Sequence, residues 1–263
     1  MDFTLTEYRS FLAALNRSGY AGFVPAEGSI NLQEGRTVLL RHDVDKKPQD
    51  SLKMAKVEAE MGFRAIYYFR AVKCSWNESV VKEIAALGHE IGYHYECLTT
   101  SNGNIDEAWK DFQANLARMR AIAPITSICM HGSPRSQWDS KNIWKKYDYR
   151  TTGVTFEPYL DTDFSKVLYL TDTGRQWDGW KVSVRDKIEG FQDIWNDRGL
   201  AFHSTDEVIG ALDSGRLPEF LMITTHPQRW TDSHPGWVRE IIVQKFKNII
   251  KGALISFRQN NCL

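Results

Sequence analysis

The sequence of 263 residues lacks an excess of charge of either sign, because 33 lysine and arginine residues balance 33 aspartate and glutamate residues. Proteins that bind nucleic acid usually carry a basic surplus that neutralises phosphates, so nucleic acid is not an expected partner. The chain also lacks any apolar run near the roughly 20 residues needed to cross a bilayer, and we expect no membrane span. With 42% hydrophobic and 25% charged residues, the composition is typical of a soluble globular protein.

The sequence also lacks a leader of the usual secretory kind and any paired cysteine spacing. Residues 1–15 carry charged side chains within their apolar pattern, which predicts a short amphipathic helix and not a signal peptide. No two cysteines have the CxxC spacing, so free thiols in a reducing compartment are expected. We therefore expect a cytoplasmic protein. The four cysteines are Cys74, Cys97, Cys129 and Cys262.

Several common catalytic signatures are missing. The chain has no GxGxxG dinucleotide motif, no GxxxxGK[ST] phosphate loop, no GxSxG nucleophile turn and no HExxH zinc motif. It has no internal repeat, low-complexity tract or Pro/Gly/Ser-rich linker, which favours a single domain over residues 1–263. Against these absences, seven histidines and nine tryptophans are the unusual part of the composition.

Short apolar runs alternate with amphipathic segments along most of the chain. This alternation predicts parallel strands joined by right-handed crossovers, and therefore an α/β domain. Aromatic residues, glycine and aspartate interrupt every period in residues 149–198, where we expect short strands and long loops. The expected strands are residues 37–40, 65–69, 89–94, 125–130 and 220–225, and the expected helices are residues 48–62, 77–87, 105–123, 205–212 and 236–251.

Polar residues follow four of these strands at the point where each strand ends. The carboxyl ends of parallel strands meet on one face, where the active sites of α/β proteins are built. A single such Asp or His is more often a turn former or a structural residue, but four strands that end in this way predict a functional cluster. The residues concerned are His42, Asp43, Asp45, His94, Glu96, His131 and His226.

Carboxylates and neutral imidazoles are suitable ligands for Zn²⁺ or another divalent first-row ion. Three protein ligands leave a position open for water, and such an ion lowers the pKa of that water from ~15.7 toward ~7. A second carboxylate can then act as a base. The residue types therefore predict hydrolysis assisted by a divalent metal ion, with zinc as the expected cofactor.

Three segments resemble motifs of a known family. Leu40–Asp45, Gly88–His94 and Leu221–Pro227 resemble the first, second and last motifs of the polysaccharide deacetylases, carbohydrate esterase family four. The resemblance extends in the same order over residues 37–230, and it is strongest to a branch associated with bacterial surface polysaccharide (O-antigen) synthesis. It implies a distorted (β/α) barrel that uses a divalent metal to remove an N-acetyl or O-acetyl group from a sugar or a sugar nucleotide.

The resemblance also implies roles for individual residues. Asp43 matches the general base, Asp45 the metal-binding carboxylate and His94 the first histidine of the metal motif. His226 matches the histidine that protonates the leaving group, a role that suits an imidazole with an unperturbed pKa near ~6.5. The family expects a second metal-binding histidine four residues after the first, but this chain has Leu98 there.

Two residues are candidates for the missing ligand. His131 ends the next strand, and Glu96 lies two residues beyond His94 and so points to the same side of an extended segment. We favour His131, because adjacent strand ends converge better. His89 is an odd number of residues from His94, which assigns it to structure, and His42 has no settled role.

Substrate contacts are expected from the irregular later part of the chain. Trp177 and Trp230 each follow a loop arginine, and flat aromatic faces suit sugar rings. Arg175 and Arg229 could bind a carboxylate or phosphate of the substrate, or instead orient Asp172 or Asp43. The residues assigned to substrate binding are Glu96, Asp172, Arg175, Trp177, Arg229 and Trp230.

Two other functions fit the same residues. One is hydrolysis of a cyclic amide or ureide, which relatives of this superfamily also perform. The other is a degenerate barrel that binds carbohydrate or a partner protein without turnover. Retention of a metal would separate both hydrolases from the degenerate barrel.

Overall fold

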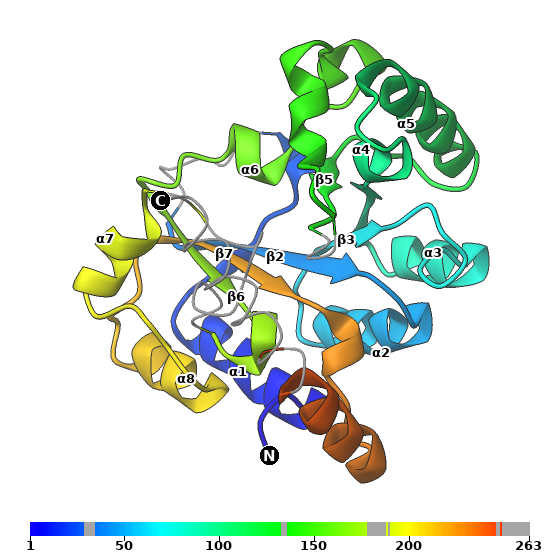
Figure 1. Cartoon of the computed structure of the whole chain (residues 1–263). Coiled ribbons are helices and arrows are strands. Elements are labelled where there is room, and N and C mark those ends of the chain that lie inside the picture. Colours follow the sequence, from blue (N-terminus) through cyan, green and yellow to red (C-terminus); the bar gives the residue numbers. More distant parts are fainter. Residues whose placement is uncertain (29–34, 133–135, 178–187, 189, 246–247, 249–263) are drawn as a thin grey trace.

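The computed structural model describes the chain except for residues 29–34, 133–135, 178–187, 189, 246–247 and 249–263. Within the described part, seven strands form one parallel sheet in the order β5-β4-β3-β2-β7-β6, and β1 pairs with the start of β2 (Figure 1). The strands are β1 (Ala21–Gly22), β2 (Thr37–Val44), β3 (Ile66–Phe69), β4 (Glu90–Tyr95), β5 (Ile128–Met130), β6 (Val167–Thr171) and β7 (Phe220–Thr225).

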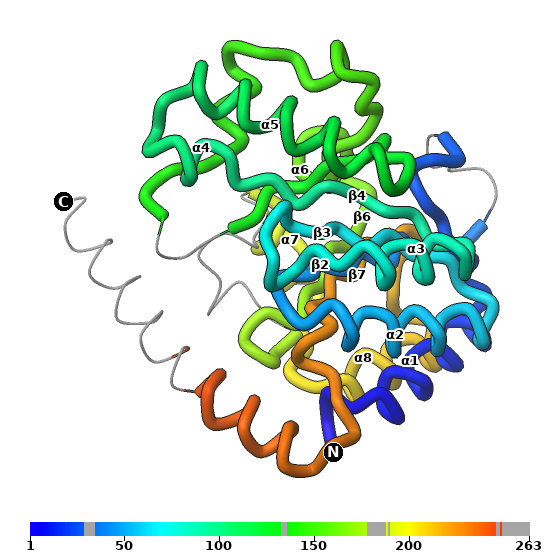
Figure 2. The backbone as a smooth tube through the Cα atoms, turned by 90° about the vertical axis from the view of Figure 1, so that its right-hand side faces the viewer, coloured from blue at the N-terminus to red at the C-terminus, as the bar shows by residue number. Residues whose placement is uncertain are grey.

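The sheet is curled into a half-barrel that stays open, because its edge strands β5 and β6 do not pair with each other in the described residues. Apolar residues of α1, α2, α3, α5 and α8 join residues of β2, β3 and β4 in one core cluster, so these helices cover the same outer face of the curled sheet. In Figures 1 and 2, α1, α2 and α8 are seen below the strands and α4 and α5 above them. This arrangement confirms the predicted α/β architecture with a distorted, barrel-like parallel sheet. The helices are α1 (Leu5–Arg17), α2 (Pro48–Glu60), α3 (Glu78–Ala86), α4 (Cys97–Thr100), α5 (Ile105–Arg120), α6 (Pro158–Asp161), α7 (Gln192–Asp197) and α8 (Thr205–Asp213).

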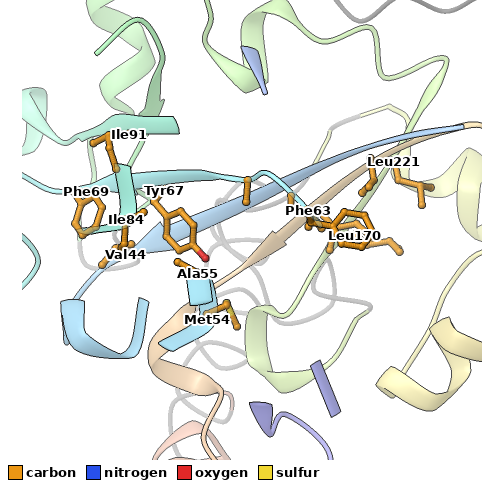
Figure 3. Packing of buried hydrophobic residues seen from close by; sticks show 14 of the residues in the cluster. Val44, Met54, Ala55, Phe63, Tyr67, Phe69, Ile84, Ile91, Leu170 and Leu221 are labelled. Atoms are coloured by element: carbon orange, nitrogen blue, oxygen red, sulfur yellow. The ribbon is translucent and has the colours of Figure 1, made fainter. Parts of the chain in front are cut away.

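Both faces of the sheet are covered, so nearly every residue of its longer strands is buried, as expected for a parallel sheet. Side chains alternate along each strand. In β2, Val38 and Leu40 pack toward the helices, and Leu39 packs into the interior of the half-barrel. Figure 3 shows the helix-facing core, in which Tyr67 of β3 and Val44 of β2 lie close to Ala55 of α2.

Most expected elements are confirmed, with shifted boundaries. The first strand continues to Val44, so Asp43 lies inside β2 and not after it. The fourth expected strand is shorter, because β5 begins at Ile128. The irregular middle contains β6 and several short helices. Residues 234–245 are helical, and most of the remainder of the expected closing helix lies outside the described residues.

The cysteines and the helices of the described part agree with two further expectations. Cys74, Cys97 and Cys129 form no disulfide within the described part of the chain, and Cys262 lies outside the described residues. No described helix combines the length and the apolar character that a membrane span requires.

A glycine in β4 allows a tyrosine to cross the interior of the half-barrel. Tyr68 of β3 and Gly92 of β4 are paired in register. The Tyr68 ring lies directly over Gly92, and its hydroxyl forms a hydrogen bond with the Ser127 side chain beyond it. A Cβ atom at position 92 would lie 2.3 Å from Cδ1 of Tyr68 and 3.2 Å from the backbone oxygen of Ser127. The absence of a side chain here is therefore a packing requirement of the interior.

We expect Gly92→Ala to destabilise the protein by about 1–3 kcal/mol, because the methyl group overpacks the interior. The matched control is Gly210→Ala in α8, where an added Cβ meets no atom within 4 Å. A helical Gly→Ala change of this kind should stabilise the protein by about 0.5–1 kcal/mol. Urea unfolding measures both changes, and an unaltered midpoint for Gly92→Ala would contradict the packing described above.

Candidate active site

Asp43 lies near the carboxyl end of β2 and is held there by an arginine on the same strand. Arg41 precedes it by two residues, so both side chains point into the half-barrel. Nε and Nη2 of Arg41 donate to the two carboxylate oxygens of Asp43 at 2.9 and 2.7 Å. Burial raises the pKa of Asp43, but the charge of Arg41 and these hydrogen bonds bring it below its usual value. Asp43 is therefore an oriented carboxylate that is ionised at neutral pH.

Asp45 follows a tight turn at the end of β2, in which its N–H donates to the carbonyl of Asp43 at 3.1 Å. The two oxygens of its carboxylate have different neighbours. Oδ2 accepts a hydrogen bond from the side-chain amide of Gln228 at 3.2 Å. Oδ1 lies 3.8 Å from Nε2 of His94 and 3.4 Å from Nε2 of His131. One oxygen is thus anchored and the other faces the two imidazoles.

His94 lies in β4 and is almost fully buried. Its Nδ1 forms a 3.0 Å hydrogen bond with the carbonyl of Cys129, the residue paired with it in β5. This bond assigns the proton to Nδ1 and leaves the Nε2 lone pair directed toward Asp43 and Asp45. Burial lowers the pKa of His94 to about 4, so the imidazole is neutral at physiological pH and available as a ligand.

His131 continues the pairing of β4 and β5, because its N–H donates to the carbonyl of Tyr95 at 2.8 Å. Its Nδ1 lies 2.9 Å from the Oε2 atom of Glu96, and its Nε2 faces Asp45. Burial lowers the pKa of His131, but its hydrogen bonds to Asp45 and Glu96 outweigh burial and raise the pKa to about 9. The imidazole therefore lies between two carboxylates.

Asp45, His94 and His131 each offer one ligand atom, and these atoms all lie within 4.8 Å of one another. One carboxylate oxygen and two imidazole nitrogens form a suitable donor set for zinc with an open position. Both histidines also have an acceptor at Nδ1, which is the usual outer contact of a metal-binding histidine. These three residues therefore fit a divalent metal ion.

A second group of possible ligands, formed by Asp43, His94 and Cys129, meets the same distance criterion. In this group both oxygens of Asp43 are already bonded to the buried Arg41. Oδ1 of Asp45 instead faces the two imidazoles, which makes the first group the better site.

Glu96 contributes no atom to this group. It lies just before α4, and Arg70 donates to both of its oxygens, with Nη2 at 2.7 and 2.9 Å. Burial raises the pKa of Glu96, but hydrogen bonds from His131 and Arg70 bring it down to about 2. Of the two candidates for the missing ligand, His131 faces Asp45, and Glu96 forms a hydrogen bond with the other side of the His131 ring.

His226 follows β7 and forms a pair with Asp172, which follows the adjacent strand β6. The two strands are in register at Thr171 and Thr224, and the N–H of Asp172 donates to the carbonyl of Thr224 at 3.1 Å. Nδ1 of His226 lies 2.6 Å from Oδ1 of Asp172. Burial and the charge of Arg229 lower the pKa of His226, but Asp172 outweighs both and raises it above its ordinary value. The pair favours a protonated imidazole.

Asp172 is fully buried and accepts several hydrogen bonds. Its oxygens accept from Nη1 of Arg229 at 2.6 Å and from the indole N–H of Trp230 at 2.8 Å, in addition to His226. Burial raises its pKa, but the charges of Arg229 and His226 bring it down to about 2. Of the two expectations for Arg229, the structure therefore favours the one in which it orients Asp172.

The expected sugar contacts of Trp177 and Trp230 are corrected by the structure. Both side chains are 1% exposed, so neither presents a face to a ligand. They pack with Phe3 in an aromatic cluster, and the indole N–H of Trp177 donates to Thr205. Arg175 donates to the backbone carbonyls of Asp2 and Arg229 and likewise supports the loops around His226. Spacing alone did not distinguish a loop tryptophan from a core tryptophan.

The remaining histidines near these strands have structural partners. His42 points away from Asp43 and is fully buried, with Nε2 2.6 Å from Glu58 of α2 and Nδ1 2.7 Å from the Thr225 hydroxyl. His89 lies 2.9 Å from the carbonyl of Ala55, as its structural assignment predicted.

Sequence reasoning missed three side chains that hold the cluster together: Arg41, Arg70 and Gln228. Arg41 carries a detectable signal, since an arginine two residues before an aspartate in a buried strand must share its face. Arg70 ends β3 in the same way that the other polar residues end their strands. Gln228 carries no comparable signal, because its contact with Asp45 depends on the turn after β7.

No protein-family model matches the chain, and no curated protein matches it. The solved structures that are similar to it include two from Bacillus subtilis. A variant of the peptidoglycan deacetylase PdaC from Bacillus subtilis is 10% identical, with 86% of this chain and 98% of that chain covered and a TM-score of 0.39. PdaA from Bacillus subtilis, a family 4 carbohydrate esterase, is 12% identical, with 89% and 82% covered and a TM-score of 0.39. Similarity at this level is no basis for assigning an activity to this chain.

We expect Asp172→Asn to lower the pKa of His226, because the carboxylate that stabilises the imidazolium is lost. Titration of the imidazole signals by nuclear magnetic resonance in metal-free protein measures the change. Asp213→Asn, which removes a carboxylate from an exposed pair with Arg17, is the control and should leave the titration unchanged. An unchanged pKa in Asp172→Asn would show that the 2.6 Å contact does not control the proton on His226.

Proposed function

We propose that this protein is a metal-dependent hydrolase that removes an acetyl group from a sugar or a sugar-containing precursor. The observation that carries the proposal is the meeting of three functions at one edge of the sheet. A fitted metal-ligand group, an ionised carboxylate and a histidine whose pKa is raised by a buried carboxylate lie at the ends of β2, β4, β5 and β7. Metal-assisted hydrolysis of an acetyl group uses all three.

Asp45, His94 and His131 would hold the metal. His131 would take the role of the family's second metal-binding histidine, whose position is occupied by Leu98 in this chain. Leu98 is buried in the helix-facing core and cannot approach the ligand group. A bound divalent ion would polarise the acetyl carbonyl and make water more acidic. Because the pKa of His131 is raised to about 9 without a metal, His131 would have to lose its proton in order to bind the ion at neutral pH.

Asp43 acts as the general base in this proposal. Arg41 fixes the orientation of its carboxylate and lowers its pKa, so Asp43 is ionised but weakly basic. A weak base removes a proton efficiently only from an acidified water, which explains why the base and the metal ligands must be neighbours. Nε2 of His94 lies 3.7 Å from Oδ2 of Asp43, so the base lies beside the metal site.

His226 acts as the general acid. Asp172 holds Nδ1, so the Nε2 proton is the one to be transferred to the departing amine or alcohol of the sugar. Asp172 raises the pKa of His226 above its ordinary value, which favours the protonated form that a general acid needs. Asp172, Arg229 and Trp230 act as positioning residues for this acid and do not touch the substrate.

Five finer features belong to the same proposal. We infer zinc as the metal from the mixed oxygen and nitrogen ligands. We also propose an acetylated sugar or sugar nucleotide as the substrate, a role in the synthesis of bacterial surface polysaccharide such as O-antigen, and action in the cytoplasm by a single catalytic domain over residues 1–263. The resemblance of the three motifs supports the proposed substrate and the role in surface polysaccharide synthesis, and the pattern of residues 1–15 and the cysteine spacing support the location.

Release of acetate from acetylated amino sugars and their nucleotide-linked forms by the zinc-loaded protein tests the function. We expect Asp43→Asn to retain zinc and to lower kcat by about 10²–10⁴-fold, the usual contribution of a positioned general base. Asp213→Asn, far from the site on the surface, is the matched control and should leave kcat unchanged.

The outcomes separate the competing functions. Acetate release that Asp43→Asn leaves unchanged would remove this residue as the base. Opening of cyclic amides or ureides by a zinc-loaded protein that releases no acetate would favour the second hydrolase. Failure to bind zinc, or any other divalent first-row metal, with Asp45 and His94 intact would contradict a metal-dependent hydrolase.

A further inference from the structure

Arg70 connects two segments that carry proposed metal ligands. It follows β3, which lies between β2 and β4 in the sheet. Its Nε and Nη2 donate to Glu96 at 3.0 and 2.7 Å, and Nη2 also reaches the second oxygen of Glu96 at 2.9 Å. Its Nη1 donates to the backbone carbonyl of Asp45 at 3.2 Å. One guanidinium thus contacts both the loop after β2 and the loop after β4.

Each of the two contacts of Arg70 is linked to a proposed metal-ligand atom through one further group. Glu96 uses the same carboxylate to hold Nδ1 of His131 at 2.9 Å. The Asp45 carbonyl belongs to the residue whose Oδ1 faces both imidazoles. The rigid fork of arginine can make these contacts at once, whereas the point charge of lysine cannot make the same set.

The surroundings of Arg70 also favour a fixed geometry. The side chains of Arg70 and Glu96 are 19% and 14% exposed, so their ion pair is largely shielded from water. The backbone N–H of Arg70 donates to the hydroxyl of the buried Ser75 at 2.9 Å, and Ser75 in turn donates to the carbonyl of Val44. Both ends of the arginine are therefore tied to the end of β2.

We propose that Arg70, acting through Glu96 and the Asp45 carbonyl, is the positioning residue that assembles the Asp45, His94 and His131 group for a divalent cation. The proposal rests on the proposed function only in assuming that this group binds a metal. Outer contacts that orient metal-binding side chains typically change metal affinity by about 10–100-fold when they are removed. Arg70 itself touches neither metal nor substrate.

The chain offers a matched control at the other end of the same strand. Arg64 lies before β3 and pairs with Glu27, and its Nε donates to the carbonyl of Gly88 at 3.0 Å. It therefore resembles Arg70 in its contacts, with one carboxylate and one backbone carbonyl. It lies at the amino end of the strands, where none of the proposed ligands lie.

The test is the Zn²⁺ dissociation constant of the full chain, measured by competition with a chromophoric chelator. We expect Arg70→Met and Glu96→Gln each to weaken Zn²⁺ binding by about 10–100-fold. Arg64→Met should bind Zn²⁺ like the unchanged protein. Because Arg70 acts partly through Glu96, the double variant Arg70→Met/Glu96→Gln should lose less affinity than the product of the two single losses.

A purely structural role gives a different pattern. In that case Arg70→Met would lower the unfolding temperature of the metal-free protein and leave the Zn²⁺ affinity unchanged, which would overturn the proposal. If Arg70→Met does not fold, Arg70→Lys and Glu96→Gln decide the question in the same assay, and unchanged affinity in both would also overturn it.

Failure of this proposal can be distinguished from failure of the proposed function. Weakened Zn²⁺ binding in a protein that releases no acetate would support the role of Arg70 and contradict the deacetylase. Acetate release with unaltered Zn²⁺ affinity in Arg70→Met would do the reverse. Absence of Zn²⁺ binding by the unchanged protein would contradict both.

Discussion

The candidate site depends on one constraint, which is that a carboxylate removed from water must be paired or hydrogen-bonded. Three carboxylates at the carboxyl edge of the sheet meet this constraint with an arginine each: Asp43 with Arg41, Glu96 with Arg70 and Asp172 with Arg229. In the last two pairs the same carboxylate also binds a histidine. Charge pairing therefore leaves each carboxylate oriented, and it fixes the position of the two imidazoles.

The parallel sheet brings these pairs to one place. Asp43 of β2, Tyr68 of β3 and Gly92 of β4 lie in one row of the register, and His94 lies two residues beyond Gly92 on the same side. The arginine fork sets the orientation of each acid, and the strand register sets the distances between acids. This division of roles explains how a neutral chain can contain a site with strong local charges.

Much of this arrangement could be predicted from the sequence, because it follows from periodicity. The alternation of apolar runs and amphipathic segments predicted the parallel α/β sheet, and the polar residues at its strand ends predicted the meeting of Asp43, Asp45, His94 and His131. The partners of these residues could not be predicted in the same way. Whether Trp177 faces a ligand or the core depends on packing between distant segments, and Gln228 reaches Asp45 only through the folded turn after β7. The spacing of residues along the chain does not predict either contact.

The central claim is that His131 is the third metal ligand. The position of the family's second metal-binding histidine is occupied by Leu98 in this chain, and His131 takes over that role. X-ray absorption spectroscopy of the metal-loaded protein tests this claim most directly, because scattering from imidazole rings can be counted at the bound metal. The account predicts two imidazole ligands in the unchanged protein and one in His131→Ala under conditions where the metal stays bound. An imidazole count that His131→Ala leaves unchanged would contradict it.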